Sequence, residues 1–362
     1  MNKKLSIFFI ILTSIFVFSA CSNDDDDAPT PKLFETNGAF VINQGNYYST
    51  IAGSIGFYNS KAETFTDSVF YKANGILPGN TLQAGLVFNK KFWAIAYQSN
   101  VLFVTDGNLK LKKLLKVNAP RALAASGNYV FVTNYDGYVT RVNASSLTIV
   151  DSVKVGPNPE EMAVANGYLY VTNSDGLNYL NGYANGFSVS KINLSTFKVE
   201  KKIAVGMNPT KAVADSLGNV FVIAMGNYST VASKIQKISK EDVVSDFADA
   251  SIMAVNGTTL YAVNSVTNWS TYQTVSTYFK MNTVTGVRTD NLISEGVKHP
   301  IALGVNPTDK HLFITSFNDG QWGSDYNSAG YMNEYSQGGS LIKTFATGVN
   351  PVQLVFVRST DF

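Results

Sequence analysis

The sequence predicts an all-β protein, a seven-bladed β-propeller of four-stranded antiparallel blades, and three observations support this prediction. A short apolar strand pattern recurs seven times, hairpin turn signals such as Asn166-Gly167 separate the strands, and the two ends of the repeat region carry complementary incomplete units. The strands are apolar at nearly every position. This is expected because a neighbouring blade covers each face of a blade.

The clearest repeat covers residues 156–206 and contains four predicted strands. After Gly156-Pro157-Asn158-Pro159 come EEMAVA, an Asn-Gly turn and YLYVTN. A two-residue Asn-Gly connection between apolar runs is a strong hairpin signal. A glycine-containing loop, FSVSKINL, a polar turn and KVEKKIAVG follow, which completes a four-stranded meander.

The second strand of this unit can be followed along the whole chain. Its seven copies, 38 to 53 residues apart, are AFVIN ending at Asn43, FWAIA at Ala96, VFVTN at Asn134, LYVTN at Asn173, VFVIA at Ala224, LYAVN at Asn264 and LFITS at Ser316. Four strands per period of this length is the pattern of propeller blades. A pair of β-sandwiches or a β-helix accounts for it less well.

The two ends of the repeat region complement each other. The chain ends with Asn350-Pro351 and VQLVFV, a first strand without a second, and the region begins with AFVIN, a second strand without a first. We therefore expect the C-terminal strand to complete the N-terminal blade, which removes two open sheet edges.

Residues before the repeats are typical of export and anchoring. Residues 1–20 have a basic start and an apolar run too short for a membrane-spanning helix. Ser19-Ala20-Cys21 resembles a lipobox, so Cys21, the sole cysteine, is the expected lipidation site. Residues 21–33 form an acidic tether in which Asp24 to Asp27 are either a solvated spacer or an export tag of surface lipoproteins. Residues 34–362 are expected to form the single propeller.

Charge and composition exclude a nucleic-acid partner. Removal of Lys3 and Lys4 with the signal takes the basic count from 28 to 26, which equals the 26 acidic residues. Proteins that bind nucleic acid usually carry an excess of basic residues, and this chain has none after removal of the signal. The 19 Tyr and 23 Phe residues instead favour a large β domain with an aromatic surface.

The meander sorts the connections between two faces of the ring. The entry to each first strand and the loop from the second to the third strand lie on one face, here called the loop face. Tight polar turns such as Asn166-Gly167 lie on the other, the turn face. His311 is expected there as a surface residue.

Candidate ligand-binding residues therefore come from the loop face. They are the aromatic residues of its loops and the asparagines before its prolines: Tyr47, Tyr48, Tyr97, Tyr135, Tyr179, Tyr183, Tyr228, Trp269, Tyr272, Trp322, Tyr326, Asn158, Asn208 and Asn350. Exposed Tyr and Trp offer wide apolar faces with polar tips. The alternatives are that the aromatic residues, which include Tyr331 in the same loops, pack on one another and that the Asn-Pro pairs are purely architectural.

Catalytic chemistry finds little support. The chain has two His residues, of which His299 lies in a loop-face entry, and no cluster with metal-ligand spacing. Asp136, Asp175, Asp319 and Asp325 could supply a glycosidase pair, but Asp136 and Asp175 belong to ordinary Asp-Gly turns. We expect no enzyme activity, no metal and no cofactor.

Residues 130–179, VFVTNYDGYVTRVNASSLTIVDSVKVGPNPEEMAVANGYLYVTNSDGLNY, resemble the YncE-like seven-bladed propeller lipoproteins of Bacteroidetes. Within that group the chain is most similar to the BtuG-type surface cobalamin-binding proteins. The resemblance implies an outer-membrane lipoprotein that faces the cell exterior, captures cobalamin or a related corrinoid and passes it to a TonB-dependent transporter. A glycan-binding uptake protein, a lyase or glycosidase, and an adhesion propeller are the competing readings.

Overall fold

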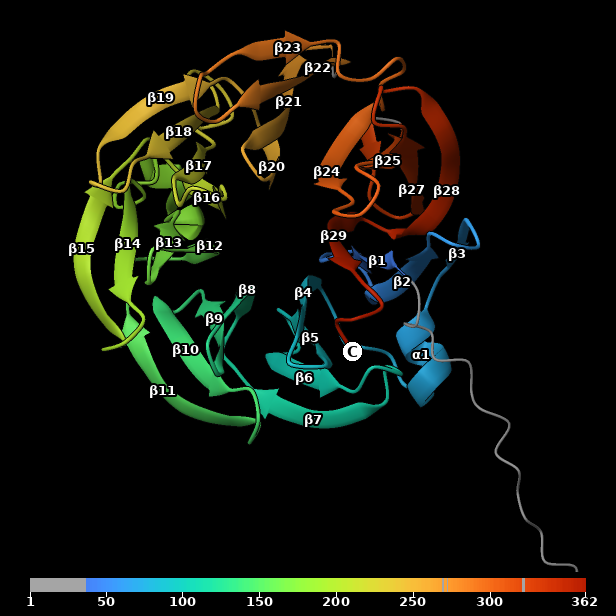
Figure 1. Ribbon diagram of the computed structural model, residues 1–362, viewed down its shortest axis with the longest axis horizontal. Helices are drawn as coiled ribbons and strands as arrows, with labels where there is room; N and C mark the ends of the chain where they lie inside the picture. Colours follow the sequence, from blue (N-terminus) through green and yellow to red (C-terminus); the bar gives the residue numbers. More distant parts are fainter. Residues whose placement is uncertain (1–36, 269, 272, 321–322) are drawn as a thin grey trace, which may run out of the picture. The chain divides into compact units, whose positions relative to one another are not determined.

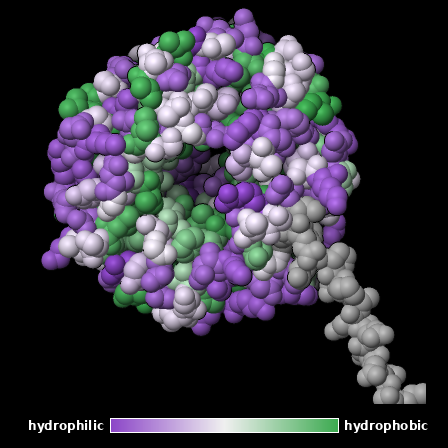
Figure 2. Space-filling model, viewed as in Figure 1, coloured by the Kyte–Doolittle hydropathy of each residue, from purple (hydrophilic) through white to green (hydrophobic). Residues whose placement is uncertain are grey.

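Four-stranded antiparallel sheets repeat seven times around a ring (Figure 1). The computed structural model describes residues 37–268, 270–271, 273–320 and 323–362. It confirms the seven-bladed β-propeller. Figure 2 shows the ring hollowed at its centre.

Each blade has an inner strand at the ring centre and an outer strand at the rim. From inner to outer, the strands of blades 1 to 4 are β29 (Pro351–Val357), β1 (Gly38–Asn43), β2 (Ser54–Asn59), β3 (Thr64–Thr66); β4 (Leu82–Phe88), β5 (Lys91–Ala96), β6 (Val101–Thr105), β7 (Leu111–Lys116); β8 (Pro120–Ser126), β9 (Tyr129–Asn134), β10 (Tyr138–Asn143), β11 (Thr148–Lys154); β12 (Pro159–Ala165), β13 (Tyr168–Asn173), β14 (Ser188–Asn193), β15 (Lys198–Ala204). Those of blades 5 to 7 are β16 (Pro209–Ala214), β17 (Val220–Ala224), β18 (Lys234–Ile238), β19 (Val244–Ala248); β20 (Ile252–Asn256), β21 (Thr259–Asn268), β22 (Gln273–Asn282), β23 (Arg288–Asp290); β24 (His299–Val305), β25 (Leu312–Gly320), β27 (Ala329–Tyr335), β28 (Leu341–Val349), with β26 (Gly323–Asp325) paired to β25.

The core consists of layers between neighbouring blades. One layer joins Trp93 and Ile95 of blade 2 to Val130 and Val132 of blade 3, and all four side chains are fully buried. Both faces of a blade are buried in this way, which explains the nearly continuous apolar strands of the sequence. The fold therefore depends on every blade having two neighbours.

Two short helical segments, which the strand pattern does not predict, lie in connections. Helix α1 (Val69–Asn74) follows β3 and buries Val69 and Phe70, while the 3₁₀ helix η1 (Gly176–Asn181) lies in the blade 4 loop. Two predicted loops are also partly strands, because β21 continues past Asn264 to Asn268 and β25 past Ser316 to Gly320. Tyr331 consequently lies in β27, paired with Ser316, and not in a loop.

The predicted ring closure is confirmed. β29 pairs antiparallel with β1, from Gly38 opposite Val357 to Asn43 opposite Pro351. The last strand of the chain is thus the inner strand of the first blade, and the ends of the repeat region are joined by a sheet.

A polar contact buried between blades 7 and 1 supports this closure. The Tyr58 hydroxyl on β2 donates to Glu334 Oε2 on β27 at 2.9 Å, and His311 Nδ1 lies 2.8 Å from Glu334 Oε1. Glu334 is almost fully buried. The expectation that His311 is a plain surface residue is therefore wrong, since its ring partners a buried carboxyl group. Burial, followed by the hydrogen bond to Glu334, raises the pKa of Tyr58 above its usual range.

Deletion of Pro351–Phe362 is expected to abolish the cooperative thermal unfolding transition of the full chain, because blade 1 loses its inner strand. A synthetic peptide of residues 351–362 added in trans should restore it by strand addition. Circular dichroism measures both effects. An unchanged transition in the truncated chain would contradict the role of β29.

The raised pKa of Tyr58 predicts a loss of stability in alkali. Above about pH 10 the unfolded chain ionises this phenol while the folded chain keeps its proton, so the free energy of unfolding should fall as the pH rises. In urea unfolding between about pH 8 and pH 11, the free energy of unfolding of Tyr58→Phe should fall less steeply with pH than that of the unaltered chain. Tyr138→Phe, at an exposed tyrosine, should match the unaltered chain. Equal slopes for Tyr58→Phe and the unaltered chain would show that Tyr58 does not cause the loss.

Candidate functional site

A cavity of about 560 Å³ lies where the central channel meets the loop face, and it is called the mouth here. Its wall combines inner-strand residues with loop residues of blades 3 to 5: Gln83, Arg121, Glu160, Glu161, Thr210, Lys211, Val352, Gln353, Tyr135, Tyr179, Tyr183, Tyr228 and Asn208. Its volume lies within the range of about 300–1,000 Å³ that ligand pockets occupy.

The inner strands reach the mouth through a repeated backbone irregularity. A register shift occurs one residue after the start of β4, where Gln83 is inserted, and of β8, where Arg121 is inserted. The inner strands of blades 1, 4, 5 and 7 carry a shift at the same place. A β-bulge re-aims the inserted side chain, and this places charged and amide groups in the mouth.

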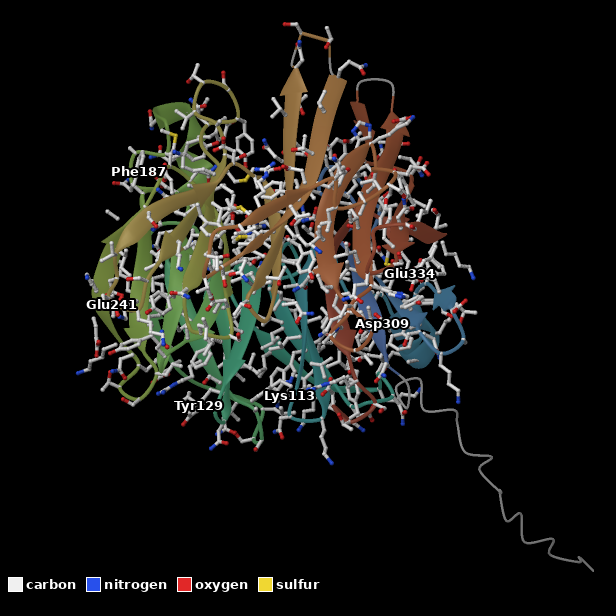
Figure 3. All side chains as sticks on the ribbon, turned by 45° about the horizontal axis from the view of Figure 1, so that its top comes forward. Lys113, Tyr129, Phe187, Glu241, Asp309 and Glu334 are labelled. Carbon is white, nitrogen blue, oxygen red and sulfur yellow. The ribbon has the colours of Figure 1, made fainter. Side chains whose placement is uncertain are left out.

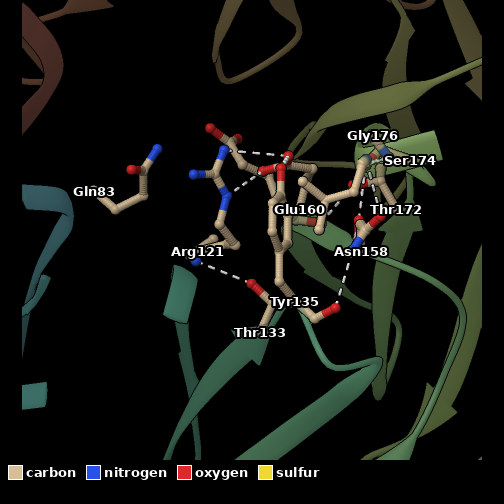
Figure 4. A network of polar contacts seen from close by, with 12 residues as sticks. Gln83, Arg121, Thr133, Tyr135, Asn158, Glu160, Thr172, Ser174 and Gly176 are labelled. Carbon is tan, nitrogen blue, oxygen red and sulfur yellow. Dashed lines mark hydrogen bonds and ion pairs between the residues drawn. The ribbon is translucent and has the colours of Figure 1, made fainter. Parts of the chain in front are cut away.

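Arg121 and Glu160 form the best-buried pair of the mouth (Figure 4). Arg121 Nε lies 2.9 Å from Glu160 Oε2 and Nη2 lies 3.2 Å from Oε1, with both side chains less than one-fifth exposed. The Tyr135 hydroxyl donates to the same carboxylate, and the guanidinium lies 4.4 Å from the centre of the Tyr135 ring. Burial has the largest effect and lowers the pKa of Arg121, but the charge and hydrogen bonds of Glu160, together with the charges of Tyr135 and Tyr97, outweigh it, and the pKa lies above its usual range. Burial, followed by the charge of Glu160, also raises the pKa of Tyr135.

A second pair makes the mouth electrically neutral. Lys211 Nζ lies 2.5 Å from Glu161 Oε1, with each side chain about one-third exposed. The two cations and two carboxylates of the cavity wall therefore neutralise each other in pairs. The mouth offers donors and acceptors side by side without a net charge.

A row of amides connects the ring closure to the mouth. Asn350 Nδ2 donates to Gln44 Oε1 at 2.5 Å, and Gln44 Nε2 donates to Gln83 Oε1 at 2.9 Å. Among the described residues nothing accepts from Nε2 of Gln83, whose amide faces Arg121 across the cavity in Figure 4. Gln353 lies beside it, and its Oε1 accepts from the backbone of Gly85 at 2.7 Å.

Five of the predicted residues line the mouth: Tyr135, Tyr179, Tyr183, Tyr228 and Asn208. Tyr179 and Tyr228 expose more than half of their side chains, whereas Tyr183 is buried. Burial raises the pKa of both Tyr183 and Tyr228. The loop-face prediction thus identifies one side of this cavity.

Three other predicted tyrosines form a row that leads to the mouth. Ring centres lie 4.8 Å apart for Tyr48 and Tyr47, 6.2 Å for Tyr47 and Tyr97, and 5.7 Å for Tyr97 and Tyr135. Tyr48 is almost fully exposed. Tyr326 is not part of this row, because it packs against Phe317 with ring centres 4.6 Å apart.

The asparagines before proline have mainly architectural roles. Asn158, Asn208 and Asn350 adopt positive φ angles of 43°, 56° and 57°, a region that asparagine tolerates better than most residues. Asn158 donates to the Tyr135 carbonyl and accepts from the Leu177 amide, both at 3.0 Å, so its side chain is engaged by the fold. The remaining predicted residues, Trp269, Tyr272 and Trp322, lie outside the described residues.

The inner-strand wall of the mouth is missing from the sequence prediction. A signal for it was present, since Arg121 and Glu160 directly follow the entry prolines Pro120 and Pro159, and Lys211 follows Pro209 by two residues. Charged residues are unexpected at the start of a strand that lines a ring centre. A search for them would have found both ion pairs.

Asp319 and Asp325, two of the acidic residues of the loop face, are not arranged as a glycosidase pair. Asp319 pairs with Ser324, while Asp325 pairs with Asn318, so the two aspartates project from opposite faces of one ribbon. Hydrogen bonds, led by that from Lys298, lower the pKa of Asp319, and hydrogen bonds, led by that from Ser328, lower that of Asp325. A glycosidase acid needs a raised pKa.

Within the described part of the chain, no three or more His, Cys, Asp or Glu residues gather where a metal ion could be held. No helix in that part is long and apolar enough to cross a membrane.

Glu160→Gln is expected to lower the free energy of unfolding by about 3 kcal/mol, because it leaves the buried Arg121 charge without its partner. Glu161→Gln is the matched control. The ion pair of Glu161 with Lys211 is more exposed and is screened by solvent, so Glu161→Gln should lower the free energy of unfolding by less than about 1 kcal/mol. Urea unfolding measures both variants. Equal losses of free energy of unfolding would show that burial does not make the Arg121–Glu160 pair more important than the Lys211–Glu161 pair.

Comparisons with known proteins agree with this fold. A family model described as "Domain of unknown function (DUF5074)" matches residues 37–350. A Lactobacillus plantarum protein of solved structure is 14% identical, with a TM-score of 0.60 over 89% of this chain and 100% of its own. Hydrazine synthase from Kuenenia stuttgartiensis is 12% identical, with a TM-score of 0.59 over 78% and 95% of the two chains. A Bacteroides uniformis protein provisionally assigned as a 6-phosphogluconolactonase is 13% identical, with a TM-score of 0.60 over 89% and 99%.

At these identities the structural likenesses show the fold alone. No curated protein matches the chain. Since the family match covers most of the residues, the protein belongs to the DUF5074 family.

Proposed function

We propose that the mouth captures a neutral ligand that is rich in carboxamide or hydroxyl groups and that the protein acts by binding without catalysis. The observation that carries this proposal is the neutral pairing of Arg121 with Glu160 and of Lys211 with Glu161 around one cavity. A charged ligand would gain no net attraction from such a wall. A carboxamide both donates and accepts, so it suits a wall where donors and acceptors alternate.

Arg121 is the central recognition group in this proposal. Its bonds to Glu160 use Nε and Nη2, and no acceptor for Nη1 is found among the described residues. The guanidinium lies beside the rings of Tyr97 and Tyr135, 5.4 and 4.4 Å from their centres. A held guanidinium with remaining N–H donors is preorganised for a ligand oxygen, which reduces the entropic cost of binding.

Cobalamin or a related corrinoid is the ligand we propose first. Its carboxamide fringe suits the donors and acceptors of the mouth, and its apolar plane suits the exposed rings of Tyr179 and Tyr228. The resemblance to BtuG-type proteins supports the same ligand. It also supports transfer to a TonB-dependent outer-membrane transporter, with the protein anchored through Cys21 and facing the cell exterior. Protease shaving of intact cells tests the exposed location.

A glycan is the second candidate, favoured by the tyrosine row of Tyr48, Tyr47, Tyr97 and Tyr135. The exposed rings of Tyr48 and Tyr47 suit a sugar ring, and the half-buried Tyr97 and Tyr135 continue the row toward the mouth. In this case the ligand would lie along the row and extend into the mouth.

Titration of the full chain with cyanocobalamin in a calorimeter tests the first ligand. We expect measurable heat, and we expect Arg121→Ala to weaken binding at least about tenfold because it removes the donor and leaves Glu160 without its partner. Arg141→Ala is the matched control, since Arg141 belongs to the same blade and pairs with Asp151 outside the mouth. No heat from the unaltered chain at tens of micromolar protein, or equal weakening by both substitutions, would overturn the proposal.

A further inference from the structure

Blade 6 differs from the other blades where its inner strand begins. The link into β20 has no proline, and β20 pairs with β21 in unbroken register from Ile252 to Asn256. The inner strands of the other six blades carry a register shift near their start, and in blades 1 to 5 residues beside the shift line the mouth. The corresponding residue of blade 6 is Ser251, which precedes Asn264 by thirteen residues as Arg121 precedes Asn134, so a small hydroxyl side chain occupies this place at the seam between blades 5 and 6.

A slot of about 350 Å³ occupies this seam. The blade 5 loop forms one wall, the start of the extended β21–β22 hairpin forms the other, and Asp249 and Ser251 lie between them. Figure 3 shows the hairpin standing above the other strands. The slot shares Met225, Tyr228 and Ser251 with the mouth, so the two cavities adjoin.

The blade 5 loop holds Tyr228 firmly at the boundary between the two cavities. Asn227 Oδ1 accepts from the backbone amides of Ser229 at 3.1 Å and Val231 at 2.8 Å, which fixes the turn. Gly226 has a φ of 67°, and a Cβ added there would lie 2.0 Å from the Val231 carbonyl oxygen. Tyr228 itself has a φ of 57°, an uncommon conformation for an aromatic residue, and its ring is half exposed.

The other groups of the slot are mostly hydroxyls. Ser229, Ser233, Ser251, Ser265 and Thr267 line it, while Asp249 is its one charged residue. Val266 adds an apolar edge from the hairpin. An aromatic face, a carboxylate that accepts two neighbouring hydroxyls, and further small polar groups are the elements that bind a sugar ring, whose C–H face is apolar and whose edge carries hydroxyls.

We propose that this slot is a saccharide-binding site, in which one sugar ring stacks on Tyr228 and its hydroxyls donate to Asp249. The site is separate from the Arg121 wall of the mouth, so it does not require the mouth to bind a corrinoid. A sugar-bearing ligand could occupy the slot and the mouth together, because Tyr228 borders both.

Val266→Trp tests the slot directly by filling it with an indole ring. Val284→Trp is the matched control: it makes the same change in the same blade, at a side chain of nearly equal exposure (61% against 62%), in the turn before β23 and outside both cavities. The full chain and both variants are applied to an array of immobilised oligosaccharides. We expect at least one glycan to bind the unaltered chain and Val284→Trp equally, and Val266→Trp at least about tenfold more weakly, a change of about 1.4 kcal/mol.

Tyr228 provides a second, independent measurement. Tyr228→Phe keeps the ring and should retain glycan binding, whereas Tyr228→Ala should lose it. Failure of the unaltered chain to bind any glycan overturns the proposal, as does binding that Val266→Trp leaves unchanged. Glycan binding that depends on Arg121 and not on Val266 would assign the glycan to the mouth, and it would likewise overturn the proposal that the slot binds a saccharide. Cyanocobalamin calorimetry uses a different probe, so failure of the corrinoid proposal is distinguishable from failure of this one.

Discussion

Pairing of β29 with β1 is the contact on which the rest of the molecule depends. Each blade is apolar on both faces, and a sheet of that kind is stable only between two neighbours. Six complete blades without the closing strand would leave the first blade one strand short, with an open edge beside the ring centre. Closure of the ring therefore protects every layer of the core, including layers far from the pairing of β29 with β1. The buried contact among Tyr58, Glu334 and His311 ties blade 7 to the blade that closure completes.

The mouth follows from the same closure, because it exists only where inner strands of different blades converge. A bulge one residue into an inner strand is a small local irregularity, yet its repetition around a ring directs several side chains to one place. Glu160 and Glu161 from one strand can therefore pair with Arg121 and Lys211 from the strands on either side. This arrangement buries charge without creating a net charge. This neutrality is the basis of our proposal that the cavity takes polar neutral groups in preference to ions.

The sequence predicted the architecture well and the site only in part. Periodic strands, Asn-Gly turns and complementary ends are local signals, and each specifies a blade without knowledge of distant contacts. Tyr135, Tyr179 and Tyr228 were identified because loop position follows from the meander. Arg121, Glu160 and Lys211 were missed because their role depends on the bulges and on contacts between strands about 40 to 50 residues apart in the sequence, which no local pattern shows. The extension of β21 and β25 beyond the expected strand ends was missed for a similar reason, since the partner residues of β22 and β26 decide it.

The amide row of Asn350, Gln44 and Gln83 gives the closing strand a second role. Val352 and Gln353 of that strand also belong to the wall of the mouth. The same strand thus both closes the ring and forms part of the wall of the mouth. A chain without this strand would keep every loop tyrosine and still have an incomplete mouth, so the cavity and the closed ring form together.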